Sequence, residues 1–157
     1  MADKSGILFH GSNVVVEKPA IQVSGFHKDF GYGFYCTRIE KQSIRWALTK
    51  PGEHIVNVYD YLPNSSLRVL SFETMTDEWL DFVVACRSGI PHEYDIVEGP
   101  MADDQIWDYV EDFMEGNISR EAFWALAKFK YPTHQIVFCT GKSLETLTFK
   151  ESRHHDE

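Results

Sequence analysis

Cysteine is scarce in this sequence, and its placement excludes the common cysteine-based sites. The 157-residue chain has three cysteines, Cys36, Cys86 and Cys139, and no CxxC pair or Cys/His cluster. An odd number of widely spaced cysteines supports neither a disulfide framework nor a zinc site. We therefore expect reduced thiols and no bound metal.

Long apolar runs are also lacking. No segment approaches the roughly 20 apolar residues that a membrane-spanning helix requires. The first residues, MADKSGILFHGS, lack the apolar region of a signal peptide. The expectation is a cytoplasmic protein without membrane association.

Positive charge is in short supply. Lys and Arg number 15 against 24 Asp and Glu, which gives a net charge of −9. Such a surface repels phosphate backbones, which disfavours nucleic acid as a partner and leaves proteins or small molecules. The chain has no repeat, linker or low-complexity segment, and its length suits one domain. We place that domain at residues 1–150 and expect residues 151–157 to form a flexible tail.

Hydrophobic periodicity and turn residues divide the chain into strands and helices. Strands at both ends bracket a helical middle, which predicts an α+β fold whose two ends share one sheet. The helix over 74–89 has Thr76 or Asp77 as its expected cap, and the helix over 119–131 has Ser119. The other predicted helices span 40–50 and 101–117, and the predicted strands span 6–10, 54–62, 66–72, 94–100, 134–140 and 146–150.

The stretch DFGYGFYCT, residues 29–37, alternates glycines with aromatic residues. Gly31 and Gly33 would weaken a strand interior, and glycines at such positions usually mark a close approach to the backbone. The pattern predicts aromatic rings, Tyr35 among them, that shape a pocket against backbone approached by another group.

Two further segments carry candidate binding residues. His10 ends the first predicted strand beside Gly11 and Ser12, where a ring nitrogen and backbone groups can meet a planar ligand. Ser43 and Trp46 share one face of the helix over 40–50. Tyr35 and Trp46 suit stacking on a flat heteroaromatic ligand, whose polar edge Ser43 would bind. Alternatively, His10 has its hydrogen bonds satisfied within the protein at a strand edge, and the aromatic rings are part of the core.

Three polar groups late in the chain have simpler interpretations. Asp103 and Asp104 could bind a divalent cation, but capping of the following helix is favoured. The pair at 154–155, two histidines, is favoured to be solvated. Gln135 begins a late strand and can donate and accept hydrogen bonds, but it is neither a base nor a carboxylate.

Taken together, these motifs resemble the ADP-ribosyltransferase superfamily, in the branch of diphtheria toxin and the poly(ADP-ribose) polymerases. That branch has a His-Gly strand, a Gly-x-Gly-x-Tyr segment, a Ser-x-x-aromatic helix and an acidic residue at the head of a late strand. Here these elements read HGS, FGYGFYCT, KQSIRWA and HQIVF. The chain is also similar, almost end to end, to a family of short bacterial proteins assigned to this superfamily. The marks of that family are DFGYGFYCT, YDIVEGPMADD and the late strand.

The resemblance implies a split β-sheet core with a helical insertion in the middle of the chain, and it implies a role for each candidate residue. His10 would bond the ribose hydroxyls on the adenosine side of NAD. The Gly11 backbone and Ser43 would hold the nicotinamide carboxamide, between the rings of Tyr35 and Trp46. Ser12 and Gly33 would also contact NAD. Gln135 would take the third position of the His-Tyr-Glu triad, which makes His10, Tyr35 and Gln135 the implied catalytic residues.

Gln135 departs from the pattern of the superfamily, because an amide keeps the hydrogen bond of a glutamate but not its charge. The loss of one electrostatic stabiliser costs about a hundredfold to a thousandfold in rate. The leading hypothesis is a mono-ADP-ribosyltransferase that uses NAD as its substrate and an unknown protein or small molecule as acceptor. By analogy, it would be a bacterial toxin or defence module with a neutralising partner. The alternatives are a weak or inactive NAD-binding module and an α+β interaction domain that binds no nucleotide.

Overall fold

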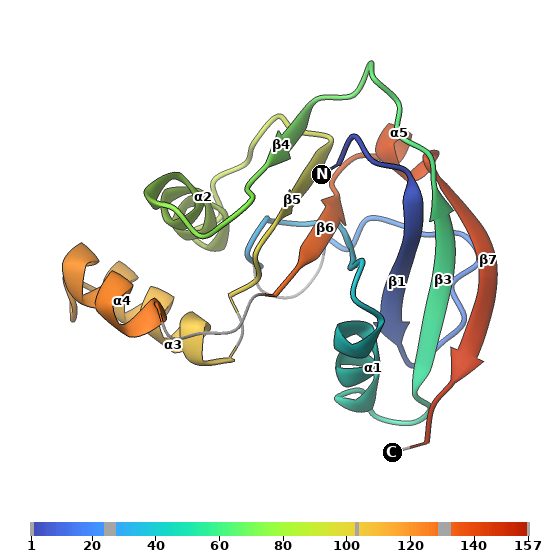
Figure 1. Ribbon diagram of the computed structural model, residues 1–157, viewed down its shortest axis with the longest axis horizontal. Helices are drawn as coiled ribbons and strands as arrows, with labels where there is room; N and C mark the ends of the chain where they lie inside the picture. The colour runs from blue at the N-terminus through green and yellow to red at the C-terminus, as the bar shows by residue number, and fades with distance from the viewer. Residues whose placement is uncertain (1, 24–27, 103, 129–132, 157) are drawn as a thin grey trace.

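Strands from the two ends of the chain flank the same central strand. A computed structural model describes residues 2–23, 28–102, 104–128 and 133–156. In its three-stranded antiparallel sheet, β1 (Gly6–Ser12) and β7 (Leu147–His154) lie on either side of β3 (Ile55–Tyr61). The predicted α+β class and the shared sheet at the two ends are confirmed (Figure 1).

A second sheet has four strands in the order β2-β6-β5-β4. Strands β2 and β5 pair antiparallel with β6, and β4 pairs parallel with β5. The bounds are β2 (Phe34–Cys36), β4 (Val69–Ser71), β5 (Ile96–Gly99) and β6 (Gln135–Phe138). Strand β2 falls in the glycine-rich stretch, for which the sequence pattern predicted only pocket-forming rings.

Four helices lie near their predicted positions, and a short fifth helix was not predicted. They are α1 (Glu40–Leu48), α2 (Asp77–Arg87), α3 (Asp104–Met114), α4 (Arg120–Ala127) and α5 (Gly141–Leu144). The side chains of Thr76 and Ser119 cap α2 and α4 by accepting bonds from Trp79 N and Ala122 N, both at 3.1 Å. Within the described ranges, no helix is long and apolar enough to cross a membrane.

The second sheet is the middle layer of the molecule. Alternation along β5 and β6 turns Val97 and Val137 toward α2, α3 and α4, and turns Ile96 and Ile136 toward the first sheet. Helix α1 covers the opposite face of the first sheet through Ala47. In Figure 1, α2, α3 and α4 gather at the end of the molecule away from the three-stranded sheet.

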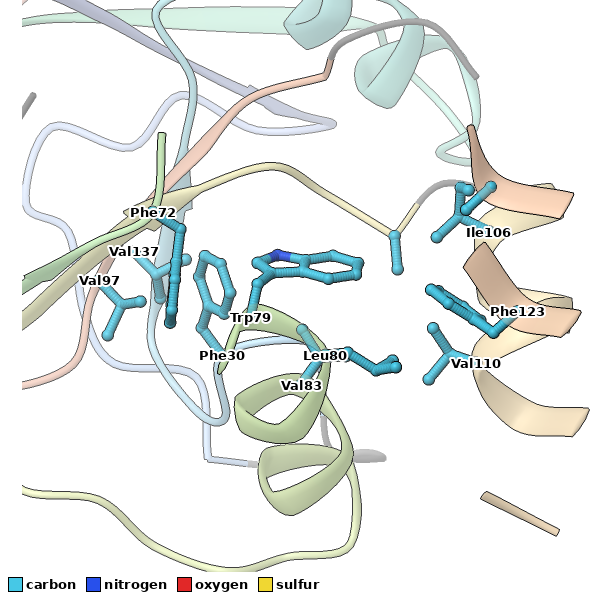
Figure 2. Packing of buried hydrophobic residues seen from close by; sticks show 12 residues of the cluster. Phe30, Phe72, Trp79, Leu80, Val83, Val97, Ile106, Val110, Phe123 and Val137 are labelled. Carbon is cyan, nitrogen blue, oxygen red and sulfur yellow. The ribbon is translucent and has the colours of Figure 1, made fainter. Parts of the chain in front are cut away.

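Trp79 is the centre of the cluster between the second sheet and the helices. Its fully buried ring lies between Val97 and Val137 on one side and Ile106 and Phe123 on the other (Figure 2). The indole Nε1 donates a hydrogen bond to the carbonyl oxygen of Pro100 at 2.9 Å. This bond holds in place the chain just after β5, which lines the candidate site.

The prediction of a flexible tail at 151–157 is wrong for residues 151–154. Strand β7 continues through them, and Glu151 and Ser152 pair with Val58 and Asn57 of the buried strand β3. Their polar side chains suggested a solvated tail, but backbone hydrogen bonds to β3 hold the segment as an edge strand.

Candidate functional site

Two adjoining clefts lie where β1, β2 and α1 come together. The first cleft has a volume of about 300 Å³ and includes Trp46 and Gln135 in its lining. The second has a volume of about 450 Å³ and extends along Ser12 and Gly33. Five residues line both clefts, so the two form one continuous site: His10, Gly11, Lys28, Tyr35 and Lys50.

His10 is held as a neutral hydrogen-bond acceptor. Its Nδ1 lies 2.6 Å from the carbonyl oxygen of Tyr35, and its ring stacks on Phe34 with centroids 4.1 Å apart. A carbonyl only accepts, so Nδ1 carries the proton and Nε2 keeps a lone pair for a ligand. Burial, together with the charges of Lys50 and Lys28, lowers the pKa of His10 to about 4. At neutral pH, the ring is therefore uncharged.

Tyr35 forms a fixed wall of both clefts. Its hydroxyl donates to the carbonyl oxygen of Gly31 at 2.7 Å and accepts from the backbone N–H of Phe30 at 3.1 Å. Burial, and then the charge of Asp29, raises the pKa of the Tyr35 phenol well above its usual range. The phenol therefore stays protonated at neutral pH, and Tyr35 contributes a ring surface instead of a base.

Gln135 lines the first cleft and is almost fully buried, with 2% of the residue exposed. Its amide nitrogen Nε2 lies 3.1 Å from Asp29 Oδ2 and 3.3 Å from the carbonyl oxygen of Pro100. Both neighbours are acceptors, so both amide hydrogens are used. The described residues provide no partner for Oε1, which remains an acceptor for a ligand.

Asp29 is the carboxylate that sequence reasoning missed. It is 3% exposed and lines the first cleft. Its Oδ1 accepts bonds from two guanidinium nitrogens of Arg87, one of them Nε at 2.8 Å, and its Oδ2 accepts from Ala102 N at 2.7 Å. The sequence does offer a signal, because Asp29 opens the glycine-aromatic stretch. Its role depends on Arg87, 58 positions away, which only the fold brings near.

Lysines make the site locally positive in a chain of net charge −9. Lys28 and Lys50 line both clefts, and Lys18 lines the second. Partial burial, and then the charge of Lys50, lowers the pKa of Lys28. Among the described residues that line the clefts, Asp29 is the one acidic group, and Arg87 neutralises it. The arrangement favours an anionic ligand.

Gly11 and Gly33 make room for the protein itself. A Cβ at Gly11 would lie 2.2 Å from the carbonyl oxygen of Ser43, in α1. A Cβ at Gly33 would lie 2.6 Å from Val137 Cγ1, in the paired strand β6. A close approach was predicted at Gly31 and Gly33; it is confirmed at Gly33, where the approaching group belongs to β6, but a Cβ at Gly31 would meet only His92 Nε2 at 3.9 Å.

Ser43 does not take the place predicted for it. The residue is fully buried, lines neither cleft, and donates its hydroxyl to the carbonyl oxygen of Glu40 at 2.6 Å. Its backbone carbonyl oxygen lies beside Gly11, where α1 packs closely on β1. The other predicted binding residues line one or both clefts: His10, Gly11, Ser12, Gly33, Tyr35, Trp46 and Gln135.

A second buried carboxylate, Glu98, serves the fold beside the site. Its Oε2 accepts from His134 Nε2 at 2.5 Å and from Arg38 Nε at 2.8 Å. Burial raises the pKa of Glu98, but the hydrogen bonds and charges of His134 and Arg38 together outweigh burial and leave the pKa below its usual value. Glu98 lines neither cleft, and its contacts tie β5 to the start of β6.

The structure tests the predicted metal ligands only in part. Asp103 and the side chain of Asp104 lie outside the described residues. Elsewhere in the described chain, no group of three or more metal-ligating side chains gathers.

Comparison with family models matches residues 7–149 to a family described as "Protein of unknown function (DUF3990)". Curated proteins and solved structures give no match.

Proposed function

The chain belongs to the DUF3990 family, and we propose that it is a mono-ADP-ribosyltransferase that binds NAD in the paired clefts. One observation carries the proposal. His10, Tyr35, Trp46 and Gln135 come from β1, β2, α1 and β6, and all four line the first cleft. The resemblance in their motifs assigns these four residues to NAD. We also propose that the two sheets form the split core of that superfamily, with α2 to α4 as its helical insertion.

The shape and charge of the clefts suit the parts of NAD. The nicotinamide ring lies in the first cleft between Tyr35 and Trp46, where stacking is favourable. The diphosphate lies near Lys28 and Lys50, which face both clefts. Neutral His10 accepts a hydrogen bond from a ribose hydroxyl through Nε2. The nicotinamide ribose presents its 2′-hydroxyl to Oε1 of Gln135.

The reaction breaks the bond between nicotinamide N1 and ribose C1′. The bonding electrons leave with nicotinamide, which becomes neutral, and positive charge develops on the ribose. The acceptor then bonds to C1′ and gives up a proton. The clefts contribute orientation of the ring and a hydrogen bond to the ribose as that charge develops. The acceptor is a protein side chain or a small molecule.

An NAD-binding module with little turnover is the second candidate. The observation that favours it is the neutrality of the catalytic end of the cleft, since Gln135 is uncharged and Arg87 pairs with Asp29. Without a free carboxylate, the developing ribose charge loses a stabiliser worth about a hundredfold to a thousandfold in rate. In this case, the protein senses NAD instead of consuming it.

Calorimetry with NAD and measurement of released nicotinamide, with and without cell lysate, test both candidates. The transferase requires binding and nicotinamide release, and both fall in His10→Ala while the fold is retained. His154→Ala is the matched control, since His154 lies on β7 outside both clefts. Binding without release under any condition supports the sensor. If the folded protein binds no NAD, both candidates fail and an interaction domain remains.

The cellular role follows from the resemblance alone. We propose a cytoplasmic bacterial toxin or defence module, held in check by a neutralising partner protein. Co-purification of the chain from its host, followed by nicotinamide release before and after removal of the bound protein, tests this role. Activity that does not change on removal of the partner contradicts it.

A further inference from the structure

A buried carboxylate lies directly behind Gln135. Asp29 and Gln135 are 106 positions apart, and both are almost fully buried. The distance between Gln135 Nε2 and Asp29 Oδ2 is 3.1 Å. Neither the resemblance nor the proposed function assigns a role to Asp29.

The neighbours of Gln135 determine which way its amide faces. The Asp29 carboxylate and the Pro100 carbonyl both accept hydrogen bonds, so the NH₂ group has to face them. The carbonyl oxygen Oε1 is then directed away from both and toward the first cleft, which Gln135 lines. A glutamate at position 135 would place an oxygen against two acceptors. The pocket is therefore built for an amide at this position.

Asp29 is itself held rigidly. Two guanidinium nitrogens of Arg87 donate hydrogen bonds to Oδ1, and Ala102 N donates to Oδ2 at 2.7 Å. The guanidinium carbon of Arg87 lies 3.3 Å from the ring centroid of Trp107, which fixes the cation in turn. The position of the carboxylate is thus set by α2, α3 and the chain after β5.

We propose that Asp29 is the positioning residue of this site, and that it orients Gln135 so that Oε1 accepts a hydrogen bond from a sugar hydroxyl. A bond from the amide to a carboxylate also polarises the amide and strengthens its oxygen as an acceptor. His10 Nε2 is a second neutral acceptor in the same cleft, so the two select a ligand with several hydroxyl donors. The identity of that hydroxyl as the 2′-hydroxyl of the nicotinamide ribose rests on the proposed function.

The first test compares NAD with its analogue that lacks this 2′-hydroxyl. The wild type prefers NAD by about tenfold, the value of one such hydrogen bond. In Asp29→Asn the amide of Gln135 loses its fixed orientation, and the preference falls toward unity. Asp95→Asn is the matched control, because Asp95 is equally buried, accepts bonds from Arg68 N and Thr140 Oγ1, and lines neither cleft. It lowers stability but leaves the preference unchanged.

The second test needs no ligand. Gln135→Glu sets two carboxylates against each other and replaces the amide donors with acceptors, so it lowers the melting temperature. The double variant Asp29→Asn/Gln135→Glu restores one donor and one acceptor between the two side chains, so its loss is smaller than the sum of the two single losses, although the Pro100 carbonyl still faces an acceptor. If the losses in melting temperature of the two single variants simply add in the double variant, Asp29 and Gln135 do not pair as proposed.

The two tests separate this inference from the proposed function. If folded Asp29→Asn keeps the full preference for NAD, the positioning role is wrong while NAD binding stands. If the wild type binds no NAD, the proposed function fails. The unfolding measurements then decide whether Asp29 orients Gln135.

Discussion

Gly11→Ala places a methyl group where helix α1 crosses strand β1. The added Cβ would lie 2.2 Å from the carbonyl oxygen of Ser43, 2.8 Å from Ala47 N and 2.9 Å from Trp46 Cβ. Two of these three atoms belong to the backbone, so no side-chain rotation relieves the clash. Helix α1 has to retreat by about 1 Å before the shortest contact reaches the 3.4 Å of an ordinary approach.

The retreat of α1 loosens its packing on the first sheet, where Ala47 meets Val56 and Val58. Overpacking of this kind costs about 3 kcal/mol, near the upper end of the usual range. For a chain of this length, that cost lowers the melting temperature by about 10 °C. Thermal unfolding followed by circular dichroism measures it. Gly141→Ala is the matched control, because nothing lies within 4 Å of the added Cβ, and its melting temperature stays near that of the wild type.

The result that refutes this reasoning is a Gly11→Ala protein as stable as the wild type. If such a protein also lost NAD binding, Gly11 would be needed for the approach of a ligand. The opposite outcome, a large loss of stability, assigns the glycine to the contact between helix and strand.

Three further predictions follow from the same structure. The pKa of His10 is 6.5 in the unfolded chain and about 4 in the folded protein. Because the unfolded state binds a proton more readily, acid favours it. Neutral His10 therefore contributes to the free energy of unfolding above about pH 6.5, and up to about 3 kcal/mol of it is lost toward pH 4. In urea unfolding across this range, His10→Gln loses less stability than the wild type, and an identical loss contradicts the lowered pKa. In calorimetry, Lys50→Gln weakens NAD binding about threefold at low salt and less at high salt. Lys150→Gln, which changes an exposed lysine of β7, has no effect on binding. If the two variants weaken binding equally, the electrostatic argument is wrong. Trp79→Phe lowers the free energy of unfolding by about 2 kcal/mol, because it loses volume and the bond to Pro100; an unchanged urea midpoint refutes this.

The sequence by itself determined most of the local structure. Helix positions followed from apolar spacing and from caps such as Thr76 and Ser119, whose hydroxyls bind amides three residues away. The strand over 54–62 followed from its composition, and the structure has β3 within those bounds. These features depend on neighbours in the chain, so local chemistry is enough to predict them.

The candidate site was only partly readable from the sequence. Sequence motifs led to His10, Tyr35, Trp46 and Gln135, and the fold brings all four to one cleft. Ser43 was predicted to lie in the site but lines neither cleft, because its hydroxyl binds the carbonyl oxygen of Glu40 in its own helix.

Only the tertiary structure decided what surrounds Gln135 and why certain glycines are needed. Asp29 acquires its role because α2 brings Arg87 to one oxygen while β6 brings Gln135 to the other. Gly11 is needed because α1 crosses β1 there. Polar residues 151–154 form a strand because β3 supplies their hydrogen-bond partners. Each of these contacts joins residues far apart in the chain, and the energy of a contact depends on distances that only the folded backbone sets.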